Sequence, residues 1–158
     1  MTEIVRHTLP PRTGFRSTEI AWFVSRLDDL TGVLYGDLAD IAPAELAWQP
    51  APGFNTIGML LAHLAVVETS WIDGRELIWF HERMRLARAH TVVHRQAVAD
   101  ATLTRFDRRT RRNGQLLDVD LGWVPDHLVE HHAGHGGQVL LLRHLYRARS
   151  QAPAAAAG

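Results

Sequence analysis

The chain has 158 residues, 46% of them apolar, and its 17 basic and 17 acidic side chains cancel to a formal net charge of zero. This size fits one domain with a sizeable core. The balanced charge argues against nucleic acid or anionic lipid as a partner. Because cysteine is absent, disulfides, thiolate metal ligands and a cysteine nucleophile are excluded. No apolar run approaches the ~18 residues of a membrane span, so we expect a cytoplasmic protein.

The N-terminal half predicts two long helices. Apolar residues recur at helical spacing after Ser17 or Thr18, which we expect to cap the first helix, and Pro43 should end it. A connector over residues 41–54 leads to Asn55, a good N-cap for the second helix. Sustained alternation of apolar and polar residues is missing throughout the chain, so strands are not expected.

The second half predicts further helices. Residues 75–99 are compatible with a helical turn or two at the surface, and residues 100–112 with a third long helix that Asn113-Gly114 would stop. The last helix should run from about Pro125 to Arg147. Four arginines would share one face of the third helix, either as a solvated face or as a phosphate- or carboxylate-binding face: Arg105, Arg108, Arg109 and Arg112.

Four main helices with a long middle connection predict an all-α fold, a four-helix bundle. We place the bundle at residues 17–150, after an N-terminal extension over residues 1–16. The alanine-rich residues 151–158 should form a disordered tail.

The segment Glu130–Gln138 contains closely spaced histidines that are candidate metal ligands. His131 and His135 are four residues apart, so on a helix they lie on one face and could chelate a divalent ion. His132 points about 100° away. His127 lies one turn before His131, so a 127/131 pair is the alternative.

Two further features bear on a metal site. Gly134, Gly136 and Gly137 each cost a helix about 1 kcal/mol relative to alanine, which close helix packing or space for a substrate would explain. His63, on the flank of the second helix's apolar stripe, is the best third ligand from elsewhere. A buried histidine with a purely structural role is the alternative.

The sequence also resembles the DinB-like (DinB/YfiT-like) superfamily at two places. One is the run from Trp48 to His63, where a histidine follows an apolar stretch, continuing to Glu68. The other is the run from Trp123 to Arg143, with a His-x-x-x-His-x-Gly-Gln pattern over residues 131–138. These runs and the first helix cover roughly two-thirds of the chain.

The resemblance implies a four-helix bundle, commonly a homodimer, with one divalent ion held by three side chains. Carried over by position, the metal ligands are His63, His131 and His135. Two departures are Pro125, where relatives continue a helix, and Gly136, where they often have arginine.

Three neutral imidazoles would leave open positions on a zinc or nickel ion, as in catalytic sites. Such an ion could activate water for hydrolysis or hold a small-molecule thiol as thiolate. Characterised relatives include low-molecular-weight-thiol transferases and a thiol-dependent isomerase. The resemblance therefore favours a metal-dependent thiol S-transferase whose partners are a small-molecule thiol and an electrophile.

Three more residues have candidate roles at this site. Glu68 could be a general base, and the alternative is a carboxylate at the surface or behind the metal ligands. Gln138 could orient a ligand or a water. Arg143 could bind an acidic group of the thiol cofactor, although an ion pair or a helix cap is the simpler role.

The other functional hypotheses are a non-catalytic metal-binding dimer that serves stress response or binding, a metal-dependent hydrolase or isomerase of the same fold, and a ligand-binding bundle without metal.

Overall fold

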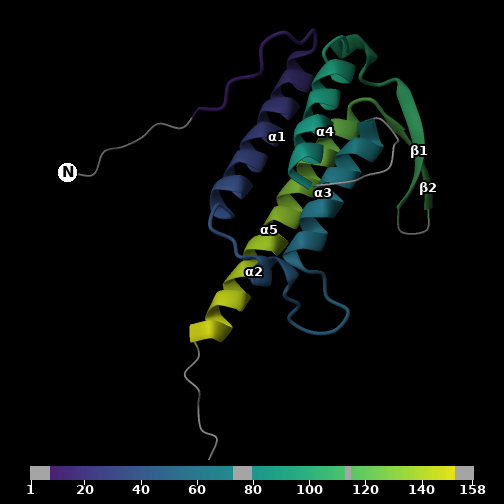
Figure 1. The fold of residues 1–158 in the computed structure, drawn as a ribbon. Helices are drawn as coiled ribbons and strands as arrows, with labels where there is room; N and C mark the ends of the chain where they lie inside the picture. Colours follow the sequence, from purple (N-terminus) through teal and green to yellow (C-terminus); the bar gives the residue numbers. More distant parts are fainter. Residues whose placement is uncertain (1–7, 73–79, 113–114, 152–158) are drawn as a thin grey trace, which may run out of the picture.

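The computed structural model describes residues 8–72, 80–112 and 115–151. Most of them are helical, and four long helices lie side by side (Figure 1). The long helices are α1 (Thr18–Asp37), α3 (Ile57–Ile72), α4 (Phe80–Arg95) and α5 (Trp123–Gln151). The prediction of a mostly helical fold is confirmed. The tail predicted for residues 151–158 lies, apart from Gln151 at the end of α5, outside the described residues.

The start of α1 is the predicted one, but its end is not. Ser17 has an extended backbone, and its hydroxyl accepts a hydrogen bond from the Ile20 amide at 3.0 Å, as an N-cap does. The helix ends at Asp37, well before Pro43. Pro43 instead begins a short helix, α2 (Pro43–Ala47), where its missing N–H costs no hydrogen bond.

The start of α3 and the start of α5 are capped by residues close to, but not at, the predicted positions. Thr56, not Asn55, precedes α3, and its hydroxyl accepts a hydrogen bond from the Met59 amide at 3.0 Å. Asp120 accepts one from the Trp123 amide at 2.7 Å, so α5 begins two residues before Pro125. The proline then lies in the first turn, where a helix tolerates it.

Residues 106–112 and 115–120 form a two-stranded antiparallel ribbon, and this corrects two predictions. In it, β1 (Phe106–Arg112) pairs with β2 (Gln115–Asp120), with Arg112 opposite Gln115. The predicted helix over residues 100–112 is wrong, because only the short 3₁₀ turn Asp100–Thr102 is helical there. The expectation of no strands is also wrong, and the arginine face of that helix does not form.

The ribbon is nevertheless part of the fold. Val119 of β2 is buried in one apolar cluster with Leu27 of α1, and with Val124 and Leu128 of α5. The Asn113-Gly114 pair, which was predicted to stop a helix, lies outside the described part of the chain.

The largest apolar cluster joins α1, α3 and α5. Its buried members are Leu34, Leu38, Ile57, Leu60, Leu61, Leu64, Val139 and Leu142. Packing is extensive between α3 and α4, between α1 and α5 and between α3 and α5, whereas α1 and α4 meet only lightly. Among the described residues, no helix combines the length and the apolar character needed to cross a membrane.

Candidate metal centre

Three histidines from two helices converge at one place. His63 comes from the middle of α3, and His131 and His135 come from successive turns of α5. The Nε2 atoms of His63 and His131 are 3.1 Å apart. One ring nitrogen from each of the three histidines lies within 4.8 Å of the others. The predicted set is therefore brought together across a sequence separation of about 70 residues.

The spacing suits a shared divalent ion. In a tetrahedral zinc site with bonds of about 2.0–2.1 Å, two ligand nitrogens lie about 3.3 Å apart. The His63–His131 separation of 3.1 Å is close to that value. The third ring, His135, has its centroid 4.4 Å from that of His131 and 4.9 Å from that of His63, so it lies beside both.

The electrostatics favour the neutral form of the His131 and His63 rings. Burial, reinforced by the neighbouring His135 and His63, lowers the pKa of His131 to about 3. Burial, followed by the effect of His135, also lowers the pKa of His63. Neutral imidazoles keep the lone pair that a metal ion needs, so these rings can bind a cation at neutral pH without first releasing a proton.

Gln138 fixes the orientation of one ring. Its Oε1 lies 2.6 Å from Nδ1 of His135. An amide oxygen can only accept, so Nδ1 of His135 carries the proton and donates it. The lone pair of His135 is then on Nε2. A partner on the non-ligating nitrogen is the usual support of a metal-binding histidine.

His127 lies next to the three histidines but does not belong to the group with metal-binding spacing. Its ring stacks on Trp123, with centroids 4.5 Å apart and planes at 14°, and its Nδ1 lies 3.5 Å from Glu130. The ring centroid of His127 is 5.7 Å from that of His131. Among the described residues, the histidine group with metal-binding spacing is the 63/131/135 set, which favours it over the 127/131 pair.

The glycines of α5 leave open space. A Cβ atom built at Gly134, Gly136 or Gly137 would meet no atom within 4 Å, so close helix packing within this chain does not explain them. Gly136 and Gly137 line a cavity of about 270 Å³ between α1 and α5 that His132 also lines. The interpretation that these glycines leave space is therefore favoured.

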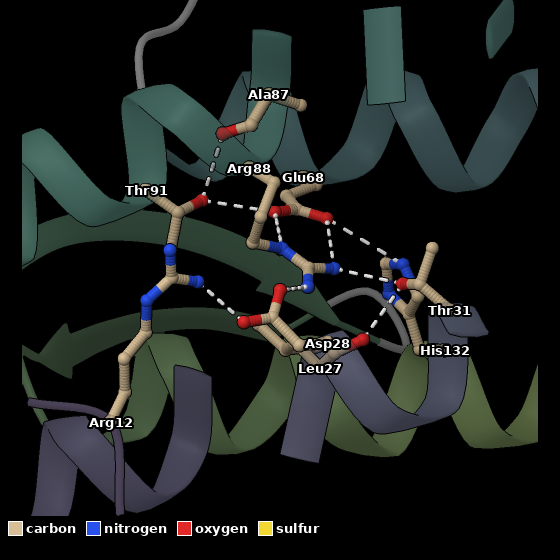
Figure 2. A network of polar contacts seen from close by, with 9 residues as sticks. All are labelled: Arg12, Leu27, Asp28, Thr31, Glu68, Ala87, Arg88, Thr91 and His132. Atoms are coloured by element: carbon tan, nitrogen blue, oxygen red, sulfur yellow. Dashed lines mark hydrogen bonds and ion pairs between the residues drawn. The ribbon is translucent and has the colours of Figure 1, made fainter. Parts of the chain in front are cut away.

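Glu68 lies in the core, so the interpretation of a surface carboxylate is wrong. Its side chain has no solvent exposure, and it accepts hydrogen bonds from Arg88 Nε at 2.8 Å and from the Thr91 hydroxyl at 3.0 Å. Figure 2 shows His132 pointing toward the same carboxylate, with Nε2 at 3.5 Å from Oε2. Both oxygens of Glu68 thus face groups of the protein.

Sequence reasoning missed the partner of Glu68. Arg88 lies in α4, in the stretch predicted to be at the surface, yet its side chain is only 11% exposed. It also donates to Asp28 at 2.5 Å and to Thr31 at 2.9 Å (Figure 2). A buried glutamate requires a partner for its charge, so knowing that Glu68 is buried would have predicted one. The sequence alone does not reveal that burial.

Arg143 makes ion pairs, the simpler of the roles considered for it. Its guanidinium contacts Asp40, and its Nε lies 3.2 Å from Oε1 of Glu45 in α2. Arg143 lies two turns beyond His135, about 12 Å along the helix axis. This arrangement holds α2 against α5, and a role in binding an acidic group stays a prediction.

A comparison with known families supports the resemblance. No curated protein matches the chain. The model of the DinB superfamily matches residues 26–139. The match covers more than half of the chain and includes all three histidines of the cluster. The chain therefore belongs to the DinB superfamily.

Proposed function

We propose that the protein is a divalent-metal-dependent enzyme that transfers a low-molecular-weight thiol to an electrophile. The observation that carries this proposal is the convergence of three imidazoles, with one nitrogen from each within 4.8 Å of the others. The ion would be zinc or nickel, held by His63, His131 and His135. Three ligands leave at least one position open, which is typical of a catalytic rather than a structural site.

In this proposal the residues of the site have different roles. The three histidines hold the ion, and Gln138 keeps Nε2 of His135 free to bind it. A bound ion would supply the charge that keeps a thiol in its thiolate form at neutral pH. The protein has no cysteine, so the thiol must come from solution.

The reaction is a nucleophilic substitution at carbon, in which the thiol sulfur is the nucleophile. The small-molecule thiol loses its proton to solvent, and its sulfur forms a bond to the electrophilic carbon. The leaving group departs from that carbon with the bonding electron pair. This balance needs no oxidant and no further co-reactant.

The first experiment measures metal content. Protein purified without chelator or nickel resin is titrated with zinc and nickel, and we expect one ion per chain. His131→Ala should lose that ion. His127→Ala is the matched control, because it removes a neighbouring ring of the same helix face, and it should keep the ion. Loss of the ion in both variants would favour the 127/131 pair, and retention of the ion in His131→Ala would exclude both sets.

The second experiment measures chemistry. Metal-loaded protein is given glutathione and monochlorobimane, which form a fluorescent thioether and chloride. We expect acceleration that depends on the metal and disappears in His131→Ala. A bound ion with a fourth protein ligand and no acceleration would favour the non-catalytic metal-binding module. Acceleration of ester hydrolysis alone would favour a hydrolase.

We propose that the protein acts as a homodimer, and that it works without nucleic acid. Its formal charge of zero supports the second expectation. Sedimentation of the metal-loaded protein tests the first, since a monomer at all concentrations would contradict it.

A further inference from the structure

A fully buried carboxylate lies between the two helices that carry the histidine cluster. Glu68 follows His63 by five residues on α3, and His132 follows His131 directly on α5. Glu68 has no solvent exposure and His132 is 3% exposed. Their side chains meet inside the protein, with 3.5 Å between Oε2 and Nε2. Each helix therefore presents a cluster histidine and, within a few residues, a buried polar group that faces the other helix.

The carboxylate is itself held in place. Arg88 donates from Nε to Oε1 of Glu68 at 2.8 Å and from Nη2 to Oε2 at 3.3 Å. Thr91 donates to Oε1 at 3.0 Å. Arg88 is in turn bonded to Asp28 of α1. Figure 2 shows these contacts as one network that reaches all four long helices.

The geometry makes the cluster sensitive to helix rotation. A ring nitrogen at the surface of a helix lies about 5–6 Å from its axis. A rotation of α5 by about 10° would then move Nε2 of His131 by about 1 Å. Metal–ligand distances tolerate only about 0.2 Å. A contact that fixes the rotation of α5 against α3 therefore controls whether the three rings can share one ion.

We propose that Glu68 and His132, supported by Arg88, are positioning residues for the metal site. The contact between Glu68 and His132 sets the rotation of α5 against α3, and with it the separation of the His63 and His131 rings. This inference rests on the proposed function, because it assumes that the rings hold a metal ion. Glu68 acts through the helices, since its two oxygens face Arg88, Thr91 and His132.

The chain offers a matched control. Glu45 is also a buried glutamate, 4% exposed, and its Oε1 lies 3.2 Å from Nε of Arg143 on α5. Arg143 is two turns from the nearest cluster histidine. Glu68→Gln and Glu45→Gln thus make the same chemical change, each at a buried glutamate that contacts a side chain of α5. Only the first glutamate touches the turn that carries the cluster.

The experiment measures zinc affinity by competition, the absorption spectrum of bound cobalt(II), and the melting temperature of the metal-free protein. We expect Glu68→Gln to weaken zinc binding by 10-fold or more, in the range found for residues behind metal ligands, and to shift the cobalt bands. Glu45→Gln should leave the zinc affinity and the cobalt bands unchanged, even if it lowers the melting temperature as much as Glu68→Gln does. Equal zinc affinity in the two variants would overturn the proposal.

A double variant separates position from stability. Glu68→Leu with Arg88→Met replaces the buried ion pair by apolar side chains of similar length, which restores stability in other proteins. We expect its melting temperature to recover and its zinc affinity to stay weak. Recovery of both would show that Glu68 only stabilises the fold. If wild-type protein itself binds neither zinc nor cobalt, the proposed function fails, and this inference fails with it.

Discussion

Two arginines that bind the same carboxylate should differ several-fold in their contribution to stability. Arg12 and Arg88 each place Nη1 2.5 Å from an oxygen of Asp28. The side chain of Arg12 is 42% exposed, whereas that of Arg88 is 11% exposed and also contacts the fully buried Glu68. Arg12→Met and Arg88→Met therefore each remove an ion pair with Asp28, but the first pair is exposed to solvent and the second is largely buried.

The magnitudes follow from burial. Removing one partner of a buried ion pair costs about 3–5 kcal/mol, because the other charge stays behind without compensation. An exposed pair contributes about 1 kcal/mol at most. At about 2–4 °C per kcal/mol for a chain of this size, Arg88→Met should lower the melting temperature by about 6–20 °C. Arg12→Met should lower it by about 4 °C or less.

Circular dichroism of the metal-free proteins during heating measures both values. Repeating the experiment in 1 M salt shortens the screening length from about 10 Å to about 3 Å. This should remove most of the Arg12 effect and little of the Arg88 effect. Equal melting temperatures for the two variants would refute the reasoning, because burial would then not determine how much each ion pair contributes to stability.

Three further changes test the site and the core. Zinc at 100 times its dissociation constant should stabilise wild-type protein by about 2.7 kcal/mol, seen as a rise in melting temperature of about 5–11 °C, and His131→Ala should show no rise. Gln138→Leu should weaken zinc binding by about 10–100-fold through the loss of the His135 hydrogen bond; an unchanged dissociation constant would show that Gln138 does not orient the ring. Leu128→Ala, at a side chain with no exposure, should cost about 2–5 kcal/mol in urea denaturation, and a loss below 1 kcal/mol would mean that the site repacks.

The parts of the fold that depend on local signals were predictable from the sequence. The cap at Ser17 and the four-residue spacing of His131 and His135 are both properties of one helix and its ends. The ribbon was missed because the arginines of β1 do not alternate with apolar residues, so the strand has no period of two. The Asn113-Gly114 pair fits a helix stop as well as a hairpin turn, and periodicity could not decide between them.

The candidate site was predicted only where a resemblance supplied the long-range information. Spacing alone gave the pair on α5, and the alternative pair with His127 stayed open. The approach of His63 to His131 depends on how α3 packs against α5, which no local pattern states. The network around Glu68 was missed for the same reason, since Arg88 and Asp28 are 60 residues apart and become neighbours only when α1 and α4 come together.

The polar contacts that join the long helices lie at two different places. The histidine cluster lies where α3 meets α5, whereas Arg88 joins α4 to Asp28 of α1 and to Glu68 of α3. A cation held by the three rings would add a cross-link between α3 and α5 that the contacts of Arg88 do not provide. Metal binding and the ion pairs of Arg88 would therefore stabilise the packing of different pairs of helices.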